Sequence, residues 1–195
     1  MPAKNEDINL IRLKDRIDNS ILQTRRIFIC NAIDNDLAED TIKKLWFLEN
    51  ENPGKPITVI LNSPGGSIDA GFAIWDQLKM TSSPITTIVT GMAASMGSIL
   101  MLTADKGKRF ATPKSRVMIH QPRLSGVIQG QATDLEIQAK EILKMRKLLI
   151  EIYMQATGKS YEALEKSLDR DAWMTAEEAK SFGLLDRIIS SYKDI

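Results

Sequence analysis

Blocks of apolar residues along the chain predict short strands that alternate with helices. The expected strands cover residues 26–30, 57–62, 85–90, 109–112, 117–120 and, as the last strand, 184–189. Apolar positions with helical spacing predict intervening helices at 34–50, 67–78 and 98–104. Regular alternation of strand and helix is typical of parallel pairing within a layered core, so an α/β fold is expected.

The two ends of the chain add helices to this core. Residues 1–15 are expected to include a flexible N-terminal segment, although the apolar spacing from Ile8 to Leu22 is mostly helical. A long helix is predicted at 131–157, and its apolar residues spread over more than one face. Such a helix is covered either by a second subunit or by the core of its own domain. Nothing resembles an interdomain linker, so residues 1–195 are expected to form one domain.

Composition excludes several classes of function. Lys and Arg total 26 against 25 Asp and Glu, and no basic stripe predicts nucleic-acid binding. The first residues lack the apolar segment of a signal peptide, and no apolar run is long enough to span a bilayer. The one cysteine, Cys30, is expected to be a core thiol and leaves no disulfide within the chain. We therefore expect a cytoplasmic protein with no nucleic-acid or membrane partner.

The candidate chemistry centres on residues 91–97, Gly-Met-Ala-Ala-Ser-Met-Gly. A β-type run leads into this stretch and a helical run follows it, so Ser95 lies at a strand-to-helix junction. Small neighbouring residues allow a sharp turn and a close approach of substrate. The start of the helix also supplies unpaired N–H groups beside the hydroxyl. This is the layout of a nucleophile elbow, although a serine that only caps the helix fits equally well.

A base and an orienting acid are available for that serine. His120 is the only histidine, and it follows a strand, at the position where active-site groups of α/β sheets gather. If Ser95 is a nucleophile, this imidazole is the one available base near pH 7. Asp169 and Asp171 are both candidates for the acid that orients the imidazole. Asp171 is preferred because the apolar residues 172–174 next to it should anchor it to the core.

Two further turns contain glycine. In Ser63-Pro64-Gly65-Gly66 the glycines expose backbone N–H groups that can face a developing oxyanion, although an ordinary tight turn has the same pattern. Thr157-Gly158-Lys159-Ser160 contains the Gly-Lys-Ser of a phosphate-binding loop. The glycine required five residues earlier is Tyr153, however, and the motif follows a helix, so ATP binding is not expected. No metal or other cofactor is expected, since one histidine and one cysteine provide no ligand cluster.

Four motifs occur in an order that resembles one known family. They are Asn62-Ser63-Pro64-Gly65-Gly66, Gly91-Met92-Ala93-Ala94-Ser95-Met96-Gly97, Met118-Ile119-His120-Gln121-Pro122 and Gly130-Gln131-Ala132-Thr133-Asp134. The chain thus resembles the ClpP family, the proteolytic subunits of the ATP-dependent Clp protease, over about residues 16–190. The resemblance implies a ClpP/crotonase-type spiral of βα units with a protruding handle at about 121–157. It also implies a serine endopeptidase that hydrolyses unfolded polypeptides to short peptides.

The resemblance assigns roles to individual residues. Ser95 would be the nucleophile, His120 the general base and Asp171 the orienting acid. Gly66 and Met96 would donate the oxyanion N–H groups. The residues that would hold a peptide as an added strand are Gly65, Ile68, Pro122, Arg123 and Leu124. Asp169 and Arg170 would form a contact between rings.

The same resemblance implies partners. Two stacked seven-membered rings would interlock through the handle and receive substrate from a separate AAA+ unfoldase of the ClpX, ClpA or ClpC type. Rings of identical chains and rings mixed with a ClpP paralogue both fit the sequence. One alternative is a ring scaffold that is active only with such a paralogue. Another is a crotonase-type acyl-CoA enzyme, which shares the spiral fold but leaves Ser95 and His120 without a role.

Overall fold

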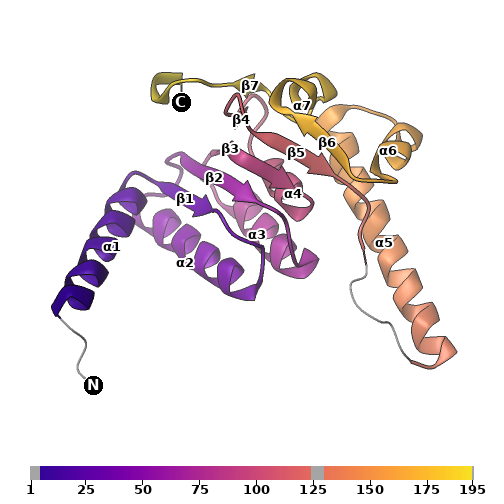
Figure 1. Cartoon of the computed structure of the whole chain (residues 1–195), viewed down its shortest axis with the longest axis horizontal. Coiled ribbons are helices and arrows are strands. Elements are labelled where there is room, and N and C mark those ends of the chain that lie inside the picture. The colour runs from indigo at the N-terminus through magenta and orange to yellow at the C-terminus, as the bar shows by residue number, and fades with distance from the viewer. Residues whose placement is uncertain (1–4, 124–129, 195) are drawn as a thin grey trace.

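A computed structural model describes residues 5–123 and 130–194, and within them the fold is mixed α/β (Figure 1). Seven strands of this part form one sheet. They are β1 (Arg26–Ile29), β2 (Ile57–Ser63), β3 (Ile85–Ala94), β4 (Arg109–Ala111), β5 (Arg116–Ile119), β6 (Ala172–Thr175) and β7 (Arg187–Ile188). The helices are α1 (Asn5–Gln23), α2 (Asn35–Glu51), α3 (Ile68–Met80), α4 (Met96–Met101), α5 (Ala132–Thr157), α6 (Tyr161–Leu168), α7 (Ala176–Phe182) and a 3₁₀ turn (Tyr192–Asp194). The expected α/β fold of βα units with one long helix is confirmed.

Strand β3 is central to the sheet. Strands β1, β2, β3, β4 and β7 lie side by side in that order, and all are parallel. On the side of β3 away from β2, Thr87–Val89 pair with β4, whereas Met92–Ala94 pair with β5. Strand β6 pairs with β5 in the antiparallel direction. Because β3 and β5 are parallel neighbours, their carboxyl ends meet at one edge of the sheet.

Helices α2, α3 and α4 lie together on one face of the sheet, over the main hydrophobic core (Figure 1). Alternation along a strand sends every second side chain into that core, as for Ile57, Val59 and Leu61 of β2, which are fully buried. The other face carries a smaller cluster made of Ile88, Phe110 and Ile189. None of the helices in the described part of the chain is long and apolar enough to cross a membrane.

Helix α5 belongs partly to the core and partly to the surface. Its C-terminal half buries Leu149, Ile150, Ile152 and Tyr153. Its N-terminal half extends away from the body of the molecule, and Ile137 and Leu143 there are each about 60% exposed (Figure 1). The apolar residues of the C-terminal half are therefore explained by packing in the core of the chain's own domain, whereas those of the N-terminal half lie on the surface.

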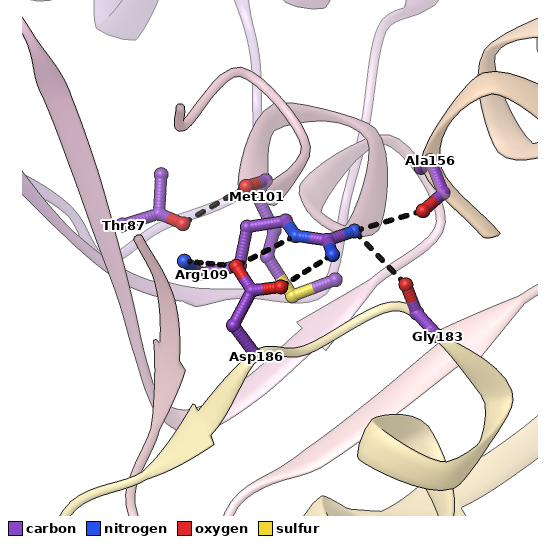
Figure 2. Close-up of polar contacts among 6 residues, drawn as sticks. All are labelled: Thr87, Met101, Arg109, Ala156, Gly183 and Asp186. Carbon is purple, nitrogen blue, oxygen red and sulfur yellow. Dashed lines mark hydrogen bonds and ion pairs between the residues drawn. The ribbon is translucent and has the colours of Figure 1, made fainter. Parts of the chain in front are cut away.

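A part-buried ion pair anchors the C-terminal end of α5 (Figure 2). Arg109 in β4 and Asp186 before β7 are joined by Nη2–Oδ1 and Nε–Oδ2 contacts of 2.6 and 3.0 Å. The same guanidinium donates from Nη1 to the carbonyl oxygens of Ala156 in α5 and Gly183 after α7, at 3.2 and 2.9 Å. One side chain thus ties two helix ends to the sheet.

Several local expectations differ from the structure. Strand β6 and helix α6 were not among the expected elements, α4 is shifted to Met96–Met101, and the last strand is only Arg187–Ile188. Residues 5–15 of the expected flexible segment lie in α1. Cys30 is exposed, so its expected core position is wrong. The burial pattern of β1 explains this, because Ile27 and Ile29 take the buried face and the alternate positions face outward.

Candidate active site

Ser95 occupies a strained turn between β3 and α4. Its backbone has φ 53° and ψ −123°, a conformation that side-chain-bearing residues rarely adopt and that costs of order 1–3 kcal/mol. Its N–H donates to the carbonyl oxygen of Met118 in β5 at 2.9 Å, which holds the turn against that strand. Within the described residues its hydroxyl caps no N–H of α4. The helix-cap interpretation of Ser95 is therefore wrong, and the elbow geometry is present.

His120 faces this serine from the end of β5. Its Nε2 lies 2.7 Å from Ser95 Oγ, which is hydrogen-bond distance. The sheet explains the contact, because Ala94, the last residue of β3, is in register with Met118 of β5. Ser95 and His120 follow that register pair by one and two residues. The sequence-predicted nucleophile and base are thus brought together by two parallel strands.

Asp171 lies on the far side of the imidazole. In the antiparallel pair Ile119 is opposite Ala172, so His120 and Asp171 are opposite one another just beyond the ladder. Asp171 Oδ1 is 3.1 Å from His120 Nδ1. That ring nitrogen is buried, and in residues 5–123 and 130–194 it has no well-aligned hydrogen-bond partner. The three side chains therefore form a Ser-His-Asp row whose second contact is close but not fully aligned.

A cation shares the Asp171 carboxylate with the histidine. The Arg123 guanidinium Nη2 contacts Asp171 Oδ1, the same oxygen that faces His120 Nδ1. Burial lowers the pKa of His120 below its ordinary 6.5, the charge of Arg123 lowers it further, and Asp171 acts in the opposite direction. The imidazole is thus neutral at pH 7, as a general base must be.

Two backbone N–H groups are available beside Ser95. Met96 is the first residue of α4, so its N–H has no acceptor within the helix. The N–H of Gly66 has no acceptor among the residues that the structure describes. Gly66 has φ 154°, and a Cβ there would lie 2.2 Å from the carbonyl oxygen of Ile33, so only glycine fits. Both predicted oxyanion donors therefore lie at the site with free N–H groups.

These groups line a cavity of about 180 Å³. Ser95 and His120 lie in its wall together with Gly66, Ile68, Pro122 and Arg123. Of the other predicted peptide contacts, Leu124 lies outside the described residues. Gly65 is not in the cavity wall but directly behind the elbow, where an added Cβ would lie 2.7 Å from Ser95 Cβ.

The cavity also has an apolar wall from α5 that was not among the expected site residues. Leu149 and Tyr153, one helical turn apart, both line it. Their four-residue spacing places them on one face of the helix, and this periodicity is the only local sequence signal that both line the same surface.

The predicted ring-contact residues lie on the surface near the site. Side chains of Asp169 and Arg170 are 61% and 87% exposed, and their charged groups are 3.9 Å apart. The carbonyl oxygen of Asp169 accepts a hydrogen bond from Gln121 Nε2 at 3.2 Å. Asp169 therefore lies beside the site, and the carboxylate that faces His120 is that of Asp171.

The Thr157–Ser160 stretch is explained by helix ends. Gly158 ends α5 in the left-handed conformation, and Ser160 caps α6 by accepting from the N–H of Ala163. The glycine and serine of this stretch are thus helix-end residues, and the stretch lacks the strand-to-helix geometry of a phosphate-binding loop. In the part of the chain that is described, no three His, Cys, Asp or Glu side chains cluster as a metal site.

The chain is similar to known proteins over nearly its whole length. The family model described as Clp protease matches residues 12–192. An ATP-dependent Clp protease proteolytic subunit 1 from Protochlamydia amoebophila is 63% identical over 192 residues, which cover 98% of this chain and 93% of that protein. Proteins of the same name from Chlamydia abortus and Chlamydia trachomatis are 59% and 58% identical over 184 residues, covering 94% of this chain and 96% of each relative. The chain therefore belongs to the Clp protease family.

Proposed function

We propose that this chain, a serine endopeptidase subunit by its family, hydrolyses peptide bonds with Ser95 as nucleophile, His120 as general base and Asp171 as orienting acid. The observation that carries the proposal is the 2.7 Å contact between Ser95 Oγ and His120 Nε2, beside two free N–H groups. A nucleophile and base at hydrogen-bond distance, with a third group behind the base, is the arrangement that activates a serine hydroxyl.

The proposed reaction has two halves. Ser95 Oγ attacks the scissile carbonyl carbon while His120 Nε2 takes the hydroxyl proton, and the resulting oxyanion accepts hydrogen bonds from the N–H groups of Gly66 and Met96. His120 then gives its proton to the leaving amine, which breaks the peptide bond and leaves an acyl-enzyme on Ser95. Water, deprotonated by His120, releases the acyl group. Asp171 stabilises the imidazolium that forms in each half.

Unfolded polypeptide is the proposed substrate. Gly66 and Ile68 border the cavity on one side, and Pro122 and Arg123 border it on the other. Two extended segments on either side of a nucleophile accept a peptide as an added strand, which recognises backbone rather than sequence. Leu124 belongs to the same proposed clamp, whereas Gly65 acts by allowing the close packing behind Ser95.

Assembly into two stacked seven-membered rings is also proposed. The exposed apolar residues on the N-terminal half of α5 need a cover, and the proposed cover is the same apolar face of a second copy of the chain. Asp169 and Arg170 lie at the same edge of the molecule as the active site and are proposed as a contact between rings. Rings mixed with a paralogue would use the same surfaces.

The partner that the proposal requires is an AAA+ unfoldase of the ClpX, ClpA or ClpC type, acting in the cytoplasm. Its proposed docking surface is the face of the sheet opposite α2, α3 and α4, where a cavity of about 840 Å³ is lined by Phe28, Ile60, Ile88 and Tyr192, and by Ile21 of α1, among others. This surface is apolar and open, so an apolar loop of the unfoldase fits it. The relatives named above carry "ATP-dependent" in their names, which supports such a partner.

One observation favours a second candidate function, a ring subunit that is active only after pairing with a paralogue. Asp171 is engaged by Arg123, and His120 Nδ1 lacks an aligned partner among the described residues. A triad in this state needs a small rearrangement before it works at full rate. The crotonase-type alternative leaves the contact between Ser95 and His120 unexplained, and nothing at the site favours it.

A labelling experiment tests the site, and an assembly experiment separates the two functions. Wild-type protein should react with a fluorophosphonate, and Ser95→Ala should not, whereas Ser167→Ala on the surface of α6 should react normally. Labelling of Ser95→Ala would overturn the assignment. Light scattering and short-peptide cleavage, with and without a co-expressed paralogue, then decide whether the chain is active in its own rings.

A further inference from the structure

Two buried hydroxyl groups connect helix α5 to the nucleophile elbow. Ser98 Oγ, in the first turns of α4, donates to the carbonyl oxygen of Ser95 at 2.6 Å. The hydroxyl of Tyr153 lies 2.7 Å from Ser98 Oγ. Ser98 is 0% exposed and Tyr153 is 1% exposed, so water does not compete for these groups.

The direction of the two hydrogen bonds follows from the number of protons. A carbonyl oxygen can only accept, so the single hydroxyl proton of Ser98 is used on Ser95. Ser98 Oγ is then the acceptor in its contact with Tyr153, and the phenol donates. Burial raises the pKa of Tyr153 well above its usual value, so this donor keeps its proton at neutral pH.

The last acceptor in this pair of hydrogen bonds, the carbonyl oxygen of Ser95, is well placed to affect catalysis. The Ser95 carbonyl oxygen accepts from both the N–H of Ser98, at 2.9 Å, and its hydroxyl. A trans peptide is planar, with its C=O and N–H pointing in opposite directions. Whatever fixes the Ser95 carbonyl oxygen therefore also fixes the N–H of Met96, the proposed oxyanion donor. The positive φ of Ser95 makes such support necessary.

We propose that Tyr153 is a positioning residue, which through Ser98 holds the Ser95–Met96 peptide so that the Met96 N–H faces the oxyanion. The inference rests on the proposed catalytic roles of Ser95 and Met96. It also gives α5 a part in catalysis. The helix that extends from the body at one end reaches the oxyanion site at the other through two hydrogen bonds (Figure 1). On this proposal, a displacement of α5 moves the N–H group of Met96.

The test compares hydroxyl deletions by steady-state kinetics and by affinity for a peptide boronate, which forms a tetrahedral adduct on the nucleophile. Removing one oxyanion donor outright slows an enzyme by about 10²–10³. Tyr153→Phe only loosens a donor, so kcat should fall about tenfold with KM nearly unchanged, and boronate affinity should fall by a similar factor. Ser98→Ala should have the same signature. Tyr153→Phe combined with Ser98→Ala should be no slower than Ser98→Ala, because Tyr153 acts through Ser98.

Thr87→Val is the matched control. Thr87 is also buried, and its hydroxyl donates to the carbonyl oxygen of Met101 at 2.9 Å, at the other end of α4 (Figure 2). It should lower thermal stability as the other deletions do, and leave kcat and boronate affinity as in the wild type.

Several results would overturn the inference. A wild-type kcat and boronate affinity in folded Tyr153→Phe would do so, and so would a double variant whose loss is the product of the two single losses. Should Tyr153→Phe not fold, wild-type kinetics in Ser98→Ala are equally decisive. Ser95→Ala distinguishes a failure of the positioning role of Tyr153 from a failure of the catalytic role of Ser95. If Ser95→Ala is inactive while Tyr153→Phe is normal, only the positioning role of Tyr153 fails. If Ser95→Ala is active, the catalytic assignment of Ser95 fails.

Discussion

His120 and Arg123 face the same atom, Oδ1 of Asp171. The imidazole Nδ1 lies 3.1 Å from that oxygen, and the guanidinium Nη2 contacts it directly. The Arg123 guanidinium carries a permanent charge, whereas His120 can be neutral or cationic, with a pKa that burial and Arg123 lower below its ordinary 6.5. The carboxylate that should stabilise the imidazolium is therefore partly neutralised by a permanent cation, which adds to burial in lowering the pKa of the base.

Replacing Arg123 with Gln should move the acid limb of the pH–rate profile to higher pH. His120 is useful only when neutral, so activity falls as the pH drops below its pKa. Burial and the charge of Arg123 both lower that pKa from 6.5, and removing the cation leaves burial and the opposing effect of Asp171. The histidine then becomes protonated at a higher pH, and activity near pH 6 should fall relative to activity at pH 8.

The measurement is kcat/KM for a short peptide across pH 5–9, since this ratio reports the free enzyme. Lys114→Gln, which removes an exposed cation from the turn before β5, is the matched control and should leave the profile unchanged. An acid limb that is the same in Arg123→Gln and wild type would contradict the coupling.

Gly65→Ala should inactivate the enzyme. Gly65 has φ 92°, and an added Cβ would lie 2.7 Å from both Ser95 Cβ and the carbonyl oxygen of Ala94. The backbone of the elbow must move to accept it, and a displacement of about 1 Å at a reacting group costs about 10² in rate. Fluorophosphonate labelling of Ser95 should slow by at least that factor.

Gly107→Ala separates this clash from the general cost of a left-handed alanine. Gly107 has φ 85° and no atom within 4 Å of an added Cβ. This variant should lose about 1–2 kcal/mol of stability and label at the wild-type rate. Equal labelling rates in the two variants would show that Gly65 has no special role behind the nucleophile.

The core of the site is predictable from sequence because each member has a local signal. Ser95 has small neighbours between a β-type and a helical run, and His120 is the only histidine. Strand β6 has no such signal, since Ala172–Thr175 is only four residues long and is stabilised by pairing with β5, more than fifty residues earlier in the chain. The same pairing places Asp171 opposite His120, which gives a structural reason for preferring Asp171 over Asp169. In the sequence, that preference rests only on the apolar residues next to Asp171.

The role of Tyr153 cannot be predicted from the sequence, for a different reason. Its sequence neighbourhood is an ordinary apolar helix, and periodicity predicts only that it is buried. That its hydroxyl meets Ser98 depends on how α5 crosses α4, which is a tertiary contact between residues 55 positions apart. Likewise, the exposure of Cys30 depends on which face of β1 the helices cover.

Glu49→Gln should weaken the fold in a pH-dependent way. Glu49, near the end of α2, accepts hydrogen bonds from the turn before β3, at 2.6 Å from Thr81 Oγ1, 2.9 Å from Ser82 N and 2.7 Å from Ser83 Oγ. Hydrogen bonds from the hydroxyls of Ser82, Thr81 and Ser83 lower its pKa to about 2. Since the folded pKa lies below the ordinary 4.5, the carboxylate contributes stability above about pH 4.5 and loses it as the pH falls toward 2.

Urea unfolding at several pH values measures this contribution. At pH 7 the variant should be less stable by about 1 kcal/mol, because the hydrogen bonds are to a charged group that water partly screens. The difference from wild type should shrink below pH 4.5. Glu51→Gln, at the exposed end of the same helix, should be neutral throughout. A pH-independent loss in Glu49→Gln would mean that the amide, not the missing charge, is responsible.

Asp186→Asn should destabilise the protein far more than the loss of a surface ion pair. Asp186 and Arg109 are only 17% and 12% exposed, and Arg109 also donates to Ala156 and Gly183 (Figure 2). Burial raises the pKa of Asp186, but hydrogen bonds from Arg109 outweigh it and the net pKa lies below 3.8. The pair therefore stabilises the fold above about pH 3.8, and this stability is lost as the pH falls further.

An asparagine keeps the shape but leaves the part-buried guanidinium without a counter-charge. The cost should lie below the roughly 3–5 kcal/mol of a fully buried pair and above that of a surface pair. Unfolding at pH 7 should show that loss, whereas Glu39→Gln, which breaks an exposed pair with Lys43, should leave the stability nearly unchanged because solvent screens that pair. Because Arg109 anchors the end of α5 that carries Tyr153, Asp186→Asn should also lower kcat below its unfolding temperature. A variant with wild-type kcat and a normal transition would show that α5 is held in place by its apolar contacts alone.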